Sequence, residues 1–110
     1  MIYELRSYDI EPTLLDLYLQ SVNDRVLPLL VNTFNFRLIG FWHAVPTSTD
    51  PAPSTNVHWI IAWESEQEML DRWAEAKATE EWAAAWQGLP KFHLKIQRTM
   101  LQAIPFSPLQ

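Results

Sequence analysis

The sequence contains no cysteine, and only two of its 110 residues are glycine. The first absence excludes disulfides, thiolate catalysis, iron–sulfur clusters and cysteine-based zinc sites. The second excludes a glycine-rich phosphate loop, because Gly40 and Gly88 stand far apart, and we therefore expect no nucleotide cofactor. A nucleophile elbow and a Ser-His-Asp signature are also missing.

Basic residues are few: eight Lys and Arg stand against 13 Asp and Glu, giving a net charge of −5. The acids gather between Glu64 and Glu81, so neither nucleic acid nor an anionic membrane would be attracted. No apolar run approaches the roughly 20 residues that span a bilayer, and no signal-peptide pattern precedes the first predicted strand. We expect a cytoplasmic protein that binds neither nucleic acid nor membrane.

Hydrophobic residues are abundant, at 48%, and aromatic residues reach 13%. This composition predicts a packed globule rather than a disordered chain. A length of 110 residues predicts a single domain over residues 1–110.

The pattern of apolar residues predicts four strands and two helical regions between them. The expected elements are strands at Ile2–Asp9, Phe36–Val45, Val57–Glu64 and Phe92–Ala103, a helix capped by Thr13, and a second helical region from Ser65 to Gly88 that restarts at Thr79. Pro28 should end or kink the first helix near Leu27. The order strand, helix, strand, strand, helix, strand predicts an α+β, ferredoxin-like βαββαβ fold with both helices on one face of the sheet.

The third predicted strand, Val57–Glu64, is apolar at nearly every position except His58, which predicts a central strand. With both helices on one face, the other face of the sheet would expose apolar residues such as Phe41 and Trp42. Large exposed apolar patches usually mark association. We therefore expect a twofold homodimer in which two sheets close face to face.

Several short motifs, in order along almost the whole chain, resemble those of the NIPSNAP family. They are Ile2-Tyr3-Glu4-Leu5-Arg6-Ser7-Tyr8, Leu27-Pro28-Leu29-Leu30, Ile39-Gly40-Phe41-Trp42, Trp63-Glu64-Ser65, Glu81-Trp82 and Pro105-Phe106-Ser107-Pro108-Leu109. The resemblance implies a dimeric α+β barrel, usually a homodimer. It also implies a fold similar to that of cofactor-free monooxygenases, small-molecule isomerases and haem-degrading enzymes, although fold alone does not transfer chemistry.

Candidate polar chemistry centres on Arg6 and His58, which we place on parallel neighbouring strands. The pair would hold an anionic or carbonyl oxygen and move a proton. Tyr3, Trp42, His43 and Trp63 are the candidate ligand-binding residues around this pair. Arg6 also shares a strand face with Glu4, so the two either meet a wet site or form a mutual ion pair on an edge strand.

The three histidines, His43, His58 and His93, lie on different strands without the local spacing of a metal site, and we predict no metal and no cofactor. Haem held by His58 is the alternative to a core histidine. Trp73, Trp82 and Trp86 recur at helical spacing, which favours core packing over a ligand cage.

Three functions remain open at this point. The leading hypothesis is a homodimer that binds a small apolar or aromatic molecule between sheet and helices. The second is a cofactor-independent monooxygenase, isomerase or cyclase that uses Arg6 and His58. The third is a protein interaction module. An enclosed cavity of about 300 Å³ or more with converging polar groups would favour the first two, and a solid core would favour the third.

Overall fold

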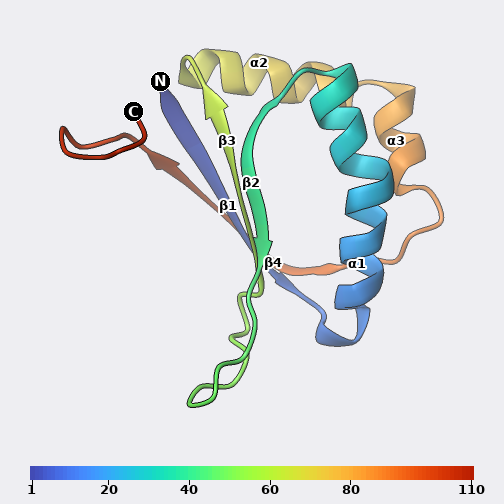
Figure 1. The fold of residues 1–110 in the computed structure, drawn as a ribbon. Coiled ribbons are helices and arrows are strands. Elements are labelled where there is room, and N and C mark those ends of the chain that lie inside the picture. The colour runs from blue at the N-terminus through green and yellow to red at the C-terminus, as the bar shows by residue number, and fades with distance from the viewer.

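The computed structural model describes residues 1–110 (Figure 1). The helices and strands follow the predicted order, with boundaries within a few residues of those expected. They are β1 (Ile2–Ile10), η1 (Pro12–Leu14), α1 (Leu15–Ser21), η2 (Val22–Val26), η3 (Leu29–Thr33), β2 (Arg37–His43), β3 (Val57–Trp63), α2 (Glu66–Lys77), α3 (Glu80–Trp86) and β4 (His93–Leu101).

One four-stranded sheet has the order β2-β3-β1-β4, and every neighbouring pair is antiparallel. The helices lie together on one side of this sheet, as Figure 1 shows. The predicted ferredoxin-like α+β architecture is therefore confirmed, and β3 is central as its apolar sequence indicated. The prediction that β1 and β3 run parallel is wrong. Strand β3 lies between β1 and β2 and pairs with both in the antiparallel sense.

Strand register divides the side chains between an inner face, which the helices cover, and an outer face. Arg6 pairs with Trp59 on the inner face, and Ser7 pairs with His58 on the outer face. Phe41 follows Trp59 on the inner face, whereas Trp42 pairs with His58 on the outer face. Side chains alternate between the faces along each strand, so these pairs assign most of the sheet.

The helical segment after β1 continues from Leu15 to Thr33 and does not end at Leu27. It changes from α-helical to π-helical bonding at η2 and again at η3, and Pro28 lies between them with helical φ and ψ of −58° and −38°. The Leu27 N–H bonds to the carbonyl of Val22, five residues back. We attribute the tolerance of Pro28 to these wider turns, which move its ring away from the preceding carbonyls. The segment ends before Asn35, whose φ is 57°.

The predicted Thr13 cap is wrong, because Glu11 occupies the capping position and accepts from the Thr13 N–H at 3.3 Å. The predicted helix starts at Ser65 and Thr79 are confirmed, and both residues cap their helices. The Ser65 hydroxyl accepts from the Glu68 N–H at 3.1 Å, and the Thr79 hydroxyl accepts from the Trp82 N–H at 3.2 Å. No helix of the structure combines the length and the apolar character needed to cross a bilayer.

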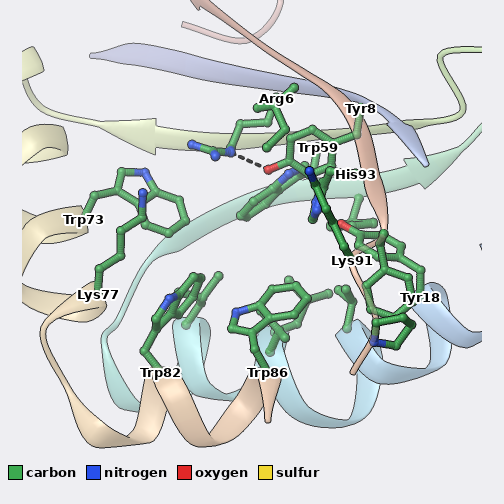
Figure 2. Close-up of a pocket in the computed structure, with 18 residues that line it drawn as sticks. Arg6, Tyr8, Tyr18, Trp59, Trp73, Lys77, Trp82, Trp86, Lys91 and His93 are labelled. Carbon is green, nitrogen blue, oxygen red and sulfur yellow. Dashed lines mark hydrogen bonds between the residues drawn. The ribbon is translucent and has the colours of Figure 1, made fainter. Parts of the chain in front are cut away.

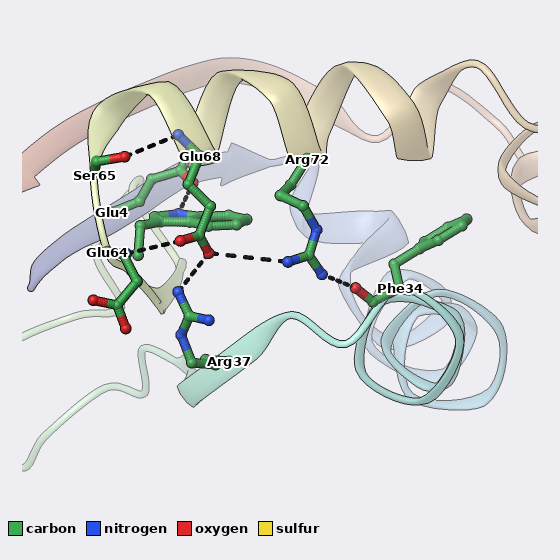
Figure 3. A network of polar contacts seen from close by, with 8 residues as sticks. Glu4, Phe34, Arg37, Glu64, Ser65, Glu68 and Arg72 are labelled. Atoms are coloured by element: carbon green, nitrogen blue, oxygen red, sulfur yellow. Dashed lines mark hydrogen bonds and ion pairs between the residues drawn. The ribbon is translucent and has the colours of Figure 1, made fainter.

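A polar network joins α2 to the start of β2 (Figure 3). The Glu68 carboxylate bonds to the Arg37 guanidinium at 2.5 Å and lies 3.9 Å from that of Arg72. Arg72 in turn donates to the carbonyl of Phe34. The network therefore fixes α2 relative to the end of the first helical segment, and these two elements form the walls of the cavity described next.

Candidate ligand site

A cavity of about 290 Å³ lies between the inner face of the sheet and the helices (Figure 2). Its wall is mostly apolar and draws on almost every element of the fold. The aromatic members are Tyr8, Tyr18, Phe41, Trp59, Trp73, Trp82, Trp86 and Phe92. A volume of this size is at the lower end of the range for small-molecule pockets.

Four tryptophans form a continuous series of edge contacts along the wall. The ring centroids of Trp59 and Trp73 are 6.1 Å apart, those of Trp73 and Trp82 are 5.9 Å apart, and those of Trp82 and Trp86 are also 5.9 Å apart. Rigid aromatic surfaces offer large contact area to a flat or apolar ligand. Trp73, Trp82 and Trp86 thus serve the core and the cavity together, because they pack in or against the hydrophobic core and also line the cavity.

The π-helical segment η2 and its continuation pack beside α3 and line the cavity through Val22, Val26, Leu27 and Leu30. A π-helical turn is rare and costs backbone geometry, and such turns often accompany functional sites. Here four aliphatic side chains of one helical segment with π-helical turns line the same cavity as the tryptophans.

Glu4 is fully buried and organises the polar end of the inner face. One carboxylate oxygen accepts from the indole N–H groups of Trp63 at 3.0 Å and Trp73 at 2.9 Å, and the other accepts from Arg6 at 2.8 Å. The predicted mutual ion pair of Glu4 and Arg6 therefore exists. It lies on a central strand beneath the helices and not on a sheet edge, so the charges are satisfied by each other and by indoles.

Arg6 extends from this ion pair into the cavity. Its Nε donates to the Tyr8 hydroxyl at 2.5 Å, and its guanidinium carbon is 4.8 Å from the centroid of the Trp73 ring (Figure 2). Burial alone would lower the pKa of Arg6, but the neighbouring Tyr8 and Glu4 outweigh it and the pKa is raised. Arg6 is therefore a permanent cation at the inner end of the cavity.

His93 is the histidine that lines the cavity. Its ring makes edge contacts with Tyr8 at 4.7 Å and Tyr18 at 5.5 Å. Burial and the charge of Arg6 lower the pKa of His93, so it is neutral at pH 7 and able to accept a proton. Burial raises the pKa of Tyr18, so that hydroxyl stays protonated.

The residues of the wall that are exposed mark the opening of the cavity. They are Lys77, Pro90, Lys91 and Ile96. The Lys77 ammonium is 5.3 Å from the centroid of the Trp73 ring. Two lysines therefore border the entrance, one at the end of α2 and one just before β4.

The structure does not bring Arg6 and His58 together. Arg6 is on the inner face, whereas His58 is on the outer face, where its Nδ1 lies 3.1 Å from the Ser7 hydroxyl. The predicted joint site is wrong because the register of β1 and β3 places these residues one position apart, which reverses the face.

The other predicted site residues are also dispersed. Tyr3 and Trp42 are on the outer face, and His43 is exposed at the end of β2. Trp63 is on the inner face but is enclosed in the core beside Phe36 and does not line the cavity. Of the predicted set, Arg6 alone lines the cavity.

Sequence reasoning missed most of the cavity wall. Two sequence patterns could have identified further wall residues. Tyr8 is two residues after Arg6 in β1 and therefore shares its face, and Lys77 is four residues after Trp73 in α2 and therefore lies on the same side of that helix. His93 gave no signal, because its inward direction depends on a bulge between β1 and β4 at Asp9 and Ile10.

The fold and site together define a ferredoxin-like α+β protein with an aromatic cavity between sheet and helices. The NIPSNAP family profile matches residues 3–108. The chain therefore belongs to the NIPSNAP family, as its motifs suggested. A search of curated proteins finds no match.

Solved structures show how widely this fold is shared. A NIPSNAP family protein from Agrobacterium tumefaciens has 22% identity and a TM-score of 0.82, with 99% of this chain and 98% of the other covered. An uncharacterized NIPSNAP-like domain protein from Burkholderia xenovorans has 24% identity and a TM-score of 0.80, with 97% and 88% covered. An antibiotic biosynthesis monooxygenase has 13% identity and a TM-score of 0.57, with 96% and 100% covered. At these identities the likeness concerns the fold alone.

Proposed function

We propose that this NIPSNAP family member binds a small apolar or aromatic molecule in the cavity between its sheet and helices. The observation that carries the proposal is a cavity of about 290 Å³ with an aromatic wall and polar groups, Arg6 and Tyr8, at one end. Such a combination of apolar surface and few converging polar groups is typical of small-molecule sites. An interaction module would not need such a cavity.

The test compares binding to the wild type and to a variant whose cavity is filled. Val22 lines the wall, so Val22→Phe should occupy the space and abolish binding of single-ring aromatic fragments in ligand-observed NMR. Extra volume in a packed region costs about 1–3 kcal/mol of stability, so circular dichroism should verify that the variant remains folded.

Val45→Phe is the matched control, since Val45 is exposed in the loop after β2 and distant from the wall. It should bind fragments as the wild type does. The proposal is wrong if no fragment binds to the wild type, or if a folded Val22→Phe variant binds them equally well.

We also propose that the protein is a homodimer. Trp42 and Leu101, which strand register places on the outer face, are 51% and 39% exposed. Apolar exposure of this extent on one sheet supports association with a second copy.

A further inference from the structure

The charged side chains of the cavity wall are all cationic. Arg6, Lys77 and Lys91 contribute to the wall, and no aspartate or glutamate does. Neither lysine takes part in an ion pair. This is an unusual distribution in a chain whose net charge is −5.

The pairing of β1 with β4 brings a further cation, Arg98, close to Arg6. Arg98 on β4 is directly opposite Arg6 on the same face of the sheet, and like charges in that position repel. Burial, and then the charges of Arg6 and Arg98, lower the pKa of Lys77. The one nearby carboxylate, that of Glu4, is already occupied by Arg6 and two indoles.

The wall also contains hydrogen-bond donors without acceptors. The indole nitrogens of Trp59 and Trp86 are buried and have no partner, although Trp63 and Trp73 both donate to Glu4. A buried donor without a partner costs about 1–3 kcal/mol, and native structures contain few of them. Both residues line the cavity, so these two N–H groups are the unpaired donors nearest to a bound acceptor oxygen (Figure 2).

Arg6 has donor capacity left for such an oxygen. Its Nη1 bonds to Glu4 and its Nε to the Tyr8 hydroxyl, while its Nη2 makes no hydrogen bond in the structure. The guanidinium is held in place by these two bonds and by the Trp73 ring, so it is preorganised and would lose little freedom on binding.

We infer that the ligand is an organic carboxylate with a small apolar or aromatic body. The tryptophan and valine walls take the body, and the carboxylate oxygens accept from the free donors and face the cations of the wall. Amines are disfavoured because no acidic group lines the cavity, and neutral analogues leave the charges of Lys77 and Lys91 without a counter-charge. This inference rests on the proposed binding function and adds the charge of the ligand to it.

The test uses three probes with one skeleton: 3-phenylpropanoate, 3-phenylpropanamide and 3-phenylpropan-1-amine, titrated into the wild type by isothermal calorimetry. We expect the carboxylate to bind at least ten-fold more tightly than the amide, and the amine to show no heat of binding. The preference for the carboxylate should weaken as salt is added, because part of it is electrostatic.

Two variants connect the preference to the wall. Lys77→Met keeps the apolar stem of the side chain but removes its positive charge. Trp86→Phe keeps an aromatic ring but removes the unpaired indole N–H. Each should reduce the ratio of carboxylate to amide affinity several-fold. Lys95→Met is the matched control: it makes the same change of charge on the outer face of β4, opposite Asp9, and should leave the ratio unchanged.

The outcomes separate this inference from the proposed function. Equal affinity for the carboxylate and the amide, with loss of both in Val22→Phe, overturns the inference and leaves cavity binding intact. An unchanged ratio in both Lys77→Met and Trp86→Phe also overturns it. Absence of binding by every probe and every aromatic fragment overturns both proposals.

Discussion

At the scale of single residues, Glu4 shows what the sequence reveals and what it withholds. Alternation along β1 predicted that Glu4 and Arg6 share a face, and they form an ion pair. The location of that pair could not be predicted, because it depends on β4 adding to the far side of β1. The same limit explains the error with His58, since a shift of one residue between strands exchanges the two faces.

Replacing Glu4 tests whether the buried ion pair stabilises the fold. Glu4→Gln keeps the shape, but its amide nitrogen cannot accept from Arg6 while its oxygen accepts from the two indoles. Leaving one buried charge without its partner costs about 3–5 kcal/mol. Urea denaturation followed by circular dichroism should show a loss of this size.

The control for this substitution is Glu64→Gln, because the Glu64 side chain is exposed and forms no ion pair. Its free energy of unfolding should change by less than about 0.5 kcal/mol. If both substitutions change the free energy of unfolding equally, then the ion pair of Glu4 with Arg6 does not stabilise the fold.

At the scale of elements, the sequence predicted the helices well but not their internal bonding. Apolar spacing and caps at Ser65 and Thr79 defined α2 and α3. Pro28 suggested a break, yet the chain passes it with π-helical turns. Propensity rules describe the α-helix, so they do not predict the wider turns at η2 and η3.

Arg25 in η2 holds α3 in place, because its Nη2 donates to the carbonyls of Ala84 at 2.8 Å and Gln87 at 3.0 Å. These carbonyls end α3, where a cation is favourable. Arg25→Met should lower the free energy of unfolding by only about 1 kcal/mol, since water can donate hydrogen bonds to the two freed carbonyls in place of Arg25. Amide hydrogen exchange in α3 should also become faster.

Lys95→Met serves as the control for Arg25→Met, since Lys95 is exposed and makes no ion pair. If both variants have the same stability and the same exchange in α3, then the contact of Arg25 with that helix does not support it.

At the scale of the whole molecule, the fold was predictable because the order of elements and the apolar sequence of β3 leave few topologies. The cavity was not predictable. It is a gap between layers whose size depends on how the helical segment from Leu15 to Thr33 and helix α3 are spaced above the sheet. No local pattern in the sequence encodes that spacing.

The proposed homodimer is the prediction at this scale. Sedimentation at micromolar concentration should give twice the chain mass of 12.9 kDa. Trp42→Glu places a charge on the outer face and should shift the equilibrium to the monomer by at least ten-fold. Leu17→Glu, a matched change at an exposed residue of α1, should remain dimeric. A monomeric wild type would contradict the proposal.

The series of tryptophan contacts along the cavity wall has an optical consequence. Indoles whose centroids lie 5.9 to 6.1 Å apart are close enough to exchange electronic excitation. Trp59, Trp73, Trp82 and Trp86 also all line the cavity. We therefore expect a quenching molecule bound there to lower the fluorescence of this group, so that intrinsic fluorescence reports cavity occupancy.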